Sequence, residues 1–245
     1  MLEQWRSGII IKIQDETPTT KRFWIQIPEL TTFQFIPGQF VTLDLPIHEQ
    51  KNKRWRSYSI ASHPDGSNII ELIIVKLEGG LGTSYLFQYA TIGMELTLRG
   101  PIGKFTLPET ISTNLFLVCT GTGIAPFRSM VNYIHANNIQ HQSIYLIFGC
   151  RKKADSLYLS ELNELTKKLE NFYFIPTYSR ETDVPEGSQI GYVHRVYTQL
   201  IEANPAYKTN ASVYLCGWKQ MVDEAKNNLQ ALGVSKNDIH LELYG

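Results

Sequence analysis

The sequence predicts a chain of two parts, an antiparallel β-barrel or sandwich followed by an α/β domain with a parallel sheet. Short alternating runs separated by turn residues dominate residues 1–108, which is typical of antiparallel all-β domains. Residues 109–245 alternate short apolar runs with amphipathic helical patterns, which is the βαβ rhythm of a parallel sheet. We therefore expect a β domain over 1–108 and an α/β domain over 109–245.

The strands of the first part are expected where apolar residues recur at every second position. These runs are GIIIKI, RFWIQI, QFVTLDL, NIIELIIVKL and MELTLRG. Turn-forming stretches such as DETPTT and HPDGSN separate them. One helical stretch, TSYLFQYA, interrupts the pattern, so we expect a helix over residues 83–90.

The second part predicts buried strands that alternate with helices. The strands are NLFLVC, SIYLIFG, NFYFIPTYS and SVYLCG, and the helices are PFRSMVNYIHAN, LYLSELNELTKKLE (157–170), HRVYTQLIEAN and KQMVDEAKNNLQAL. Parallel strands buried on both faces read as nearly continuous apolar runs. In such a sheet, ligands bind beyond the carboxyl ends of the strands.

Composition excludes several classes of protein. The formal charge is zero, with 23 basic and 23 acidic residues, so nucleic acid is not an expected partner. No apolar run approaches the length of a membrane span, and the first residues lack a signal core, so we expect a cytoplasmic protein. Cys119, Cys150 and Cys216 lie far apart without a CxxC pair, which argues against an iron–sulfur cluster and a disulfide framework. The histidines lack HExxH spacing, so no metal site is expected.

Two stretches stand out from these patterns. RSYSI, residues 56–60, is polar although its neighbours predict sheet, and a solvent-facing edge strand is the simplest explanation. TGTGIAPFR, Thr120–Arg128, follows a buried strand and opens a helix. Its two glycines allow a tight turn close to a ligand, and the helix N-terminus favours a pyrophosphate. The same turn can serve only to enter a helix, so both interpretations stay open.

Several motifs, taken in order, resemble one family. RSYSIAS, GLGTS, GPIGKF, GTGIAPFR, CGW and LELY together resemble the ferredoxin–NADP(+) reductase family of flavoenzymes, over nearly the whole chain. The resemblance implies an FAD-binding Greek-key β-barrel followed by an α/β domain that binds NADP or NAD. GPIGKF is expected to form a turn at the domain junction.

On the flavin side, the resemblance assigns roles to two of these motifs. Arg56 would pair with the FAD pyrophosphate, Tyr58 would stack on the flavin, and Ser59 would hydrogen-bond near flavin N5. Alternation turns Ser59 away from the face of Arg56 and Tyr58, so the strand must bend or end there. In the second motif, Gly82, Thr83 and Ser84 would bind a flavin phosphate, and Thr83 or Ser84 would cap the helix that follows.

On the nicotinamide side, the resemblance assigns Thr120, Gly121, Thr122 and Gly123 to the dinucleotide. Cys216 would lie beside the nicotinamide, although a buried apolar role is the alternative, and Cys119 and Cys150 are expected in the core.

Near the carboxyl end, the resemblance places Glu242 at the hydride-transfer site and Tyr244 against the flavin face opposite Tyr58. This chain has Gly245 after that tyrosine, whereas the tyrosine is terminal in plant-type members.

TYSRE resembles the family's site for the NADP 2′-phosphate, with Ser179 and Arg180 as ligands and Tyr192 stacked on the adenine. Ile190 occupies a position where plant-type members have lysine, so the choice between NADPH and NADH stays open.

The function implied by the resemblance is that of an FAD-dependent oxidoreductase. It would move a hydride between NAD(P)H and flavin and pass electrons to a protein carrier such as ferredoxin or flavodoxin. The reductase component of a multicomponent oxygenase and a flavin-holding electron-transfer subunit of a larger complex are the alternatives. Lys51, Lys53 and Arg54 would steer an acidic carrier, unless they form only a solvated loop.

Overall fold

A computed structural model describes residues 4–244 of the chain, which form two compact units. The first unit comprises the described residues up to Leu107 together with Ala125–Tyr133, and the second comprises Pro108–Ile124 and the described residues from Ile134 onward. The segment Ala125–Tyr133, which is most of helix α2 (Ala125–Ala136), thus groups with the first unit. The division into domains at residues 108 and 109 stays a prediction.

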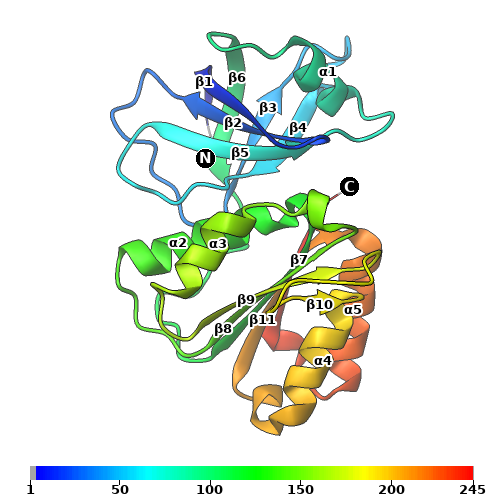
Figure 1. Cartoon of the computed structure of the whole chain (residues 1–245). Helices are drawn as coiled ribbons and strands as arrows, with labels where there is room; N and C mark the ends of the chain where they lie inside the picture. The colour runs from blue at the N-terminus through cyan, green and yellow to red at the C-terminus, as the bar shows by residue number, and fades with distance from the viewer. Residues whose placement is uncertain (1–3, 245) are drawn as a thin grey trace. The chain divides into compact units, whose positions relative to one another are not determined.

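The first unit is built on an antiparallel sheet with the strand order β4-β3-β6-β1-β2-β5 (Figure 1). Strands β4 and β5 stand at the two ends of this order, and a bridge between Ile60 and Leu72 brings these ends together. The amide of Ala61 also donates to the carbonyl of Glu71 at 2.8 Å. The predicted antiparallel barrel is therefore confirmed, with a seam between β4 and β5. The elements are β1 (Trp5–Thr17), β2 (Thr20–Gln26), β3 (Phe40–Asp44), β4 (Trp55–Ser59), β5 (Ile69–Val75), α1 (Leu81–Tyr89) and β6 (Glu95–Ile102).

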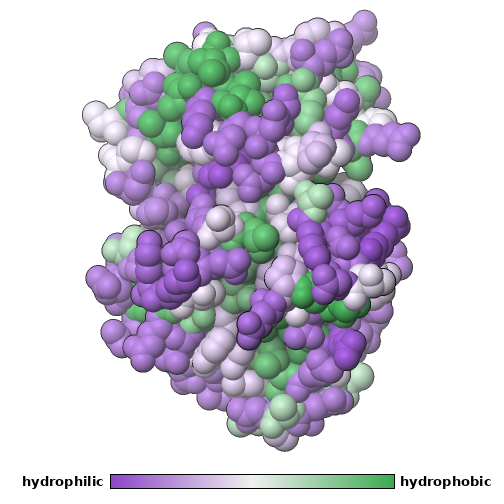
Figure 2. Space-filling model, viewed as in Figure 1, coloured by the Kyte–Doolittle hydropathy of each residue, from purple (hydrophilic) through white to green (hydrophobic). Residues whose placement is uncertain are grey.

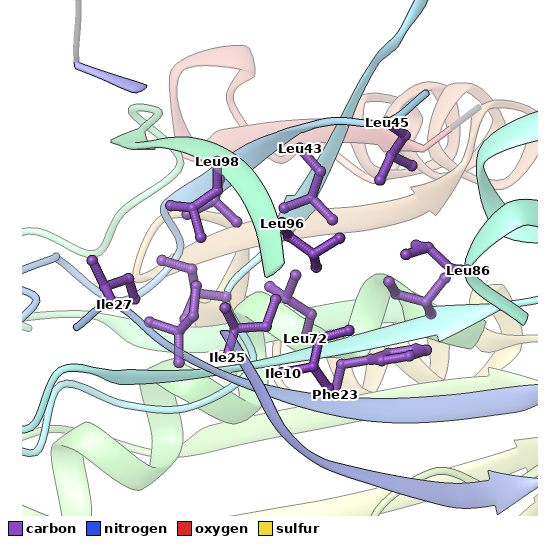
Figure 3. Close-up of a cluster of buried hydrophobic side chains, with 14 of the residues drawn as sticks. Ile10, Phe23, Ile25, Ile27, Leu43, Leu45, Leu72, Leu86, Leu96 and Leu98 are labelled. Atoms are coloured by element: carbon purple, nitrogen blue, oxygen red, sulfur yellow. The ribbon is translucent and has the colours of Figure 1, made fainter. Parts of the chain in front are cut away.

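Side chains from alternate positions of these strands fill the barrel interior (Figure 3). Phe23, Leu43, Leu72 and Leu98, from four different strands, are each at most 1% exposed, and Leu86 of α1 joins them. Burying a side chain of this size contributes roughly 1.5–3 kcal/mol relative to its exposure to water. The alternating runs thus form strands because every second residue reaches this core.

The second unit contains a parallel sheet with the order β10-β9-β8-β7-β11-β12, in agreement with the predicted α/β fold. The order turns back at β7, because β8 lies on one side of it and β11 on the other. This reversal makes the carboxyl ends of β7 and β11 the expected ligand site. The strands are β7 (Asn114–Thr120), β8 (Ile144–Cys150), β9 (Phe172–Tyr178), β10 (Gln189–Ile190), β11 (Ala211–Trp218) and β12 (Ile239–Tyr244).

Helices α4 (Val193–Ala203) and α5 (Lys219–Ala231) pack on one face of this sheet through a common apolar cluster. The cluster includes Phe116, Leu215 and Tyr197, all completely buried. Helix α3 (Leu159–Thr166) is shorter than the predicted helix 157–170. Tyr158 adopts a left-handed conformation with φ 53°, which an α-helix cannot include, so the helix begins after it.

No helix within residues 4–244 is long and apolar enough to cross a membrane. In the view of Figure 2, hydrophilic residues cover much of the surface and hydrophobic residues gather in separate patches.

Candidate functional site

Strand β4 carries the polar stretch RSYS and ends where the sequence predicts. Its ladder with β3 pairs Arg56 with Leu43, Tyr58 with Val41 and Ser59 with Phe40. The regular strand stops at Ser59, which is 5% exposed. Arg56 and Tyr58 share one side of the strand, and Ser59 begins the departure toward the seam with β5.

The side chain of Arg56 runs across the first turn of helix α1. A Cβ placed on Gly82 would lie 2.8 Å from Cγ of Arg56, so this crossing requires glycine at that position. The guanidinium donates to the carbonyls of Lys53 at 3.0 Å and Trp55 at 2.8 Å. These bonds hold a fixed positive charge beside the start of α1, where backbone N–H groups also favour an anion. The pair fits a diphosphate such as that of FAD.

The predicted cap of α1 is wrong. Helix α1 begins at Leu81, and its N-cap is Gly80, without a side-chain hydrogen bond. Thr83 Oγ1 instead accepts from the amide of Leu77 at 3.1 Å and donates to the carbonyl of Gly80 at 3.2 Å. Because neither Thr83 nor Ser84 caps the helix with its side chain, the amides of Leu81, Gly82 and Thr83 remain available to a bound phosphate. The amide of Ser84 already donates to the carbonyl of Gly80 at 2.9 Å.

Tyr58 is half buried and packs against the apolar cluster of the barrel. Burial raises the pKa of its phenol to about 12, although the positive charge of Arg56 opposes this shift. The hydroxyl therefore stays protonated at neutral pH. A neutral ring held at this place by packing suits stacking on an aromatic ligand.

In the second unit, the carboxyl ends of β7 and β11 converge on the turn Gly121–Ile124. Gly121 has φ 53°, and a Cβ on Gly123 would lie 2.5 Å from the carbonyl oxygen of Cys216. A Cβ on Gly217 would lie 2.5 Å from Thr120 Oγ1. This hydroxyl is buried and has no hydrogen-bond partner among the described residues. Gly123 and Gly217 thus allow the turn to pack against the end of β11. The unpartnered hydroxyl of Thr120, at the point where the strand order reverses, fits a dinucleotide at this turn.

Cys216, Glu242 and Tyr244 gather at the neighbouring strand ends. Cys216 is paired in register with Glu242, and its Sγ lies 4.0 Å from Oε1 of that carboxylate. Cys216 is fully buried, and burial raises the pKa of its thiol well above the ordinary range, with Glu242 adding to the effect. The side chain of Tyr244 interacts with the same thiol. Cys216 is therefore a neutral thiol that shapes the site and is unsuited to act as a nucleophile.

The other two cysteines differ from each other. Cys119 is fully buried, as predicted for a core residue. Cys150, predicted in the core, is only half buried at the end of β8, and its thiol donates to the carbonyl of Lys152 at 3.3 Å. Burial raises the pKa of Cys150 to about 12.

Ser179, Arg180 and Tyr192 come together beyond the end of β9. The amide of Ser179 donates to the carbonyl of Cys150 at 3.0 Å, and the amide of Gly191, next to Tyr192, donates to that of Tyr178 at 2.9 Å. Tyr192 is 70% exposed at the start of α4.

Arg151 lies beside this group and was not among the predicted site residues. Its carbonyl accepts from the amide of Arg180 at 2.9 Å, and both arginines are exposed. The basic run RKK directly after a buried strand was the available signal.

The predicted basic patch is smaller than expected. Lys51 and Lys53 are exposed on a 3-10 turn before β4, but Arg54 Nε lies 2.7 Å from Oδ1 of Asp44. Asp44 of β3 therefore neutralises the charge of Arg54. No group of three or more His, Cys, Asp or Glu side chains in residues 4–244 could hold a metal ion.

Two family models match the chain. Residues 7–107 match an oxidoreductase FAD-binding domain, and residues 117–227 match an oxidoreductase NAD-binding domain. The residues at both sites fit these ligands, as described above.

Relatives and solved structures agree with this match. Ferredoxin–NADP reductase B of Sorangium cellulosum is 32% identical over 244 residues, which cover 96% of each chain. The electron transfer component of toluate 1,2-dioxygenase from Pseudomonas putida is 31% identical, and the match covers 96% of this chain but 66% of that longer relative. The crystal structure of the cytochrome P450 reductase GcoB from Amycolatopsis has a TM-score of 0.85 at 26% identity and covers 98% of this chain and 70% of that one. With its FAD-binding barrel and NAD-binding α/β domain, the chain belongs to the ferredoxin–NADP(+) reductase family.

Proposed function

We propose that the chain is an FAD-dependent oxidoreductase that takes a hydride from NAD(P)H and passes electrons to a protein carrier such as ferredoxin or flavodoxin. The observation that carries this proposal is that each unit has a close approach that requires glycine, at a place that suits a diphosphate. In the barrel, Arg56 crosses Gly82 at the start of α1, and in the α/β unit a two-glycine turn meets the ends of β7 and β11. One chain thus offers a site for each of two dinucleotides.

Each unit contributes residues with distinct roles. In the barrel, Arg56, the amides of Gly82 and Thr83 and the hydroxyl of Ser84 hold the diphosphate of FAD, and Tyr58 supports the flavin ring. In the α/β unit, Thr120, Gly121, Thr122 and Gly123 hold the diphosphate of the coenzyme. Ser179, Arg180 and Arg151 bind its adenosine end, with Tyr192 on the adenine. The backbone hydrogen bonds that bring Arg151 and Arg180 together beyond the ends of β8 and β9 support this assignment.

Bound FAD supplies the redox chemistry, by accepting a hydride and releasing electrons singly. Ser59 holds a hydrogen bond at the reacting edge of the flavin. Glu242 orients a proton donor or acceptor near the nicotinamide, and Cys216 limits the volume of that pocket with a neutral thiol. Tyr244 would lie against the flavin and would move aside for the nicotinamide. The protein thus contributes position and hydrogen bonding.

Reconstitution tests the proposal. The purified chain should bind FAD in a one-to-one ratio and oxidise NADPH or NADH with ferricyanide as the acceptor. Replacing Arg56 with Ala should lower FAD affinity by one to two decades, because a hydrogen bond to a charged group contributes about 1.5–3 kcal/mol. A chain that binds FAD but does not oxidise either coenzyme would instead be a flavin-holding subunit.

A second candidate is the reductase component of a multicomponent oxygenase. The 31% identity to the toluate dioxygenase component favours it, and this chain spans 66% of that relative. Electron transfer to purified ferredoxins, flavodoxins and Rieske-type carriers, compared at equal concentration, separates the two candidates. A rate that is high only with an oxygenase-associated carrier supports the second.

A further inference from the structure

A buried carboxylate lies at the seam of the barrel. Glu71, in the middle of β5, is 2% exposed and is flanked by buried apolar residues. Arg22 of β2 donates two hydrogen bonds to this carboxylate, from Nε to Oε1 at 2.6 Å and from Nη2 to Oε2 at 3.1 Å. Arg128 of α2 adds a third bond, from Nη1 to Oε2 at 3.0 Å. All three residues belong to the first unit. A buried charge is tolerated when it is paired in this way.

Arg128 also holds the chain just beyond the flavin strand. Its Nη1 donates to the carbonyl of Ala61 at 2.8 Å. The next helix residue, Ser129, is completely buried and donates from Oγ to the carbonyl of Ser62 at 2.6 Å. Helix α2 thus hydrogen-bonds the carbonyls of Ala61 and Ser62, which follow Ser59 by two and three positions.

Strand β5 fastens the same two residues from the other side. The amide of Glu71 donates to Ser62 Oγ at 3.0 Å, and the amide of Ala61 donates to the carbonyl of Glu71 at 2.8 Å. Glu71 therefore links strand β5 to helix α2 at this point, because its backbone binds Ala61 and Ser62 while its carboxylate binds Arg128.

This support matters because the regular ladder ends at Ser59. Beyond that residue the chain pairs with β5 through the isolated bridge of Ile60 and Leu72, while the amide of Ile60 donates to the carbonyl of Gln39 at 3.0 Å. The path of residues 59–62 is thus set by α2 and Glu71 in addition to the sheet. Ser59 is the residue whose position the flavin chemistry requires.

We propose that Arg128, acting with Glu71, is a positioning residue that fixes Ser59 at the flavin by anchoring Ala61 and Ser62. The inference rests on the proposed function for the role of Ser59, but the anchoring itself does not. Arg22 provides a matched control, because it binds the same carboxylate from strand β2, whereas Arg128 binds it from helix α2 and reaches Ala61 as well.

Amide hydrogen exchange tests the anchoring without any reaction. In the FAD-loaded protein, Arg128→Ala should raise exchange at residues 60–62 by about tenfold or more. Arg22→Ala leaves the bond from Arg128 to Ala61 in place, so it should raise exchange less in this segment than in β2. Arg128→Lys keeps a positive charge but cannot span Glu71 and Ala61 in the same way, so it should also loosen the segment, and it serves if the alanine variant does not fold. Unchanged exchange at 60–62 in both Arg128 variants would overturn the proposal.

Single-turnover reduction of the bound flavin by NADPH tests the consequence for Ser59. Arg128→Ala should slow reduction by about tenfold with little change in coenzyme affinity, and Arg22→Ala should stay within about twofold. In a Ser59→Ala background, Arg128→Ala should cause no further loss, because its effect passes through Ser59. Additive losses would overturn the positioning role. If Ser59→Ala alone leaves the rate unchanged, the proposed role of Ser59 fails, while the exchange result still decides the anchoring.

Discussion

At the scale of single residues, the two arginines beyond β8 and β9 bear on coenzyme choice. Arg151 and Arg180 are exposed and joined through their backbones, so both side chains start from neighbouring points. If they bind the 2′-phosphate, Arg180→Ala and Arg151→Ala should each lower kcat/KM for NADPH by about one to two decades, as expected for one charged hydrogen bond, and spare NADH. Lys168→Ala, at an exposed position after α3, is the control. Equal losses with both coenzymes would contradict phosphate recognition.

Single residues also show what the sequence could not predict. Arg56 and Tyr58 could be placed on one face of a strand from alternation alone, and β4 has that geometry. The pairing of Arg54 with Asp44 could not be foreseen, because it joins the residue before β4 to the end of β3, and only the fold determines how these two strands pair. Arg151 was missed for the same reason, since its neighbour Arg180 lies one strand away.

At the scale of elements, the turn Gly121–Ile124 contains two glycines that are required for different reasons. Gly121 has a left-handed backbone, which asparagine also tolerates, and a Cβ added there would meet no atom of the described chain within 4 Å. A Cβ added to Gly123 would lie 2.5 Å from the carbonyl oxygen of Cys216, so no side chain fits there. Gly121→Asn should therefore change the free energy of unfolding by less than about 1 kcal/mol. Gly123→Asn should lower the free energy of unfolding by about 1–3 kcal/mol and weaken coenzyme binding.

Thermal unfolding and titration with NADP(+) compare these two variants directly. Equal losses of stability would mean that Gly123 does not hold the turn against β11.

The elements themselves were predictable where local patterns and burial agree. Strand β12 escaped prediction because its pattern is inverted, with Leu241 and Leu243 more exposed than Glu242 and Tyr244. Strand β10 has two residues and exists only through its pairing with β9. The start of α1 was misplaced because Gly80 occupies the N-cap position, where a hydroxyl side chain is the usual signal.

At the scale of the whole molecule, buried thiols predict how stability depends on pH. Burial raises the pKa of Cys119 and Cys216 well above the ordinary value of 9.0. Above pH 9 the unfolded chain loses these protons while the folded chain keeps them, so stability should fall as pH rises. Each thiol adds at most about 1.4 kcal/mol per pH unit to the slope. The free energy of unfolding, measured with urea between pH 8 and 10.5, should fall less steeply with pH in Cys119→Ala and Cys216→Ala than in the unchanged chain. An equally steep fall in both variants would show that neither thiol is responsible.

Association with an electron carrier is the remaining property of the whole molecule. Lys51 and Lys53 are exposed beside the flavin strand, whereas Arg54 is already paired with Asp44. If the two lysines steer an acidic carrier, Lys51→Glu with Lys53→Glu should lower the rate of carrier reduction about tenfold at low ionic strength. The difference should shrink as salt rises toward 0.5 M, because screening shortens the range of the field. Reduction of a small neutral quinone should be unaffected, which separates docking from flavin chemistry.

Lys168→Glu with Lys226→Glu, on the second unit, supplies the same charge change elsewhere. If the control pair lowers the rate of carrier reduction equally, the net charge of the protein governs the encounter. In that case Lys51 and Lys53 do not form the docking patch.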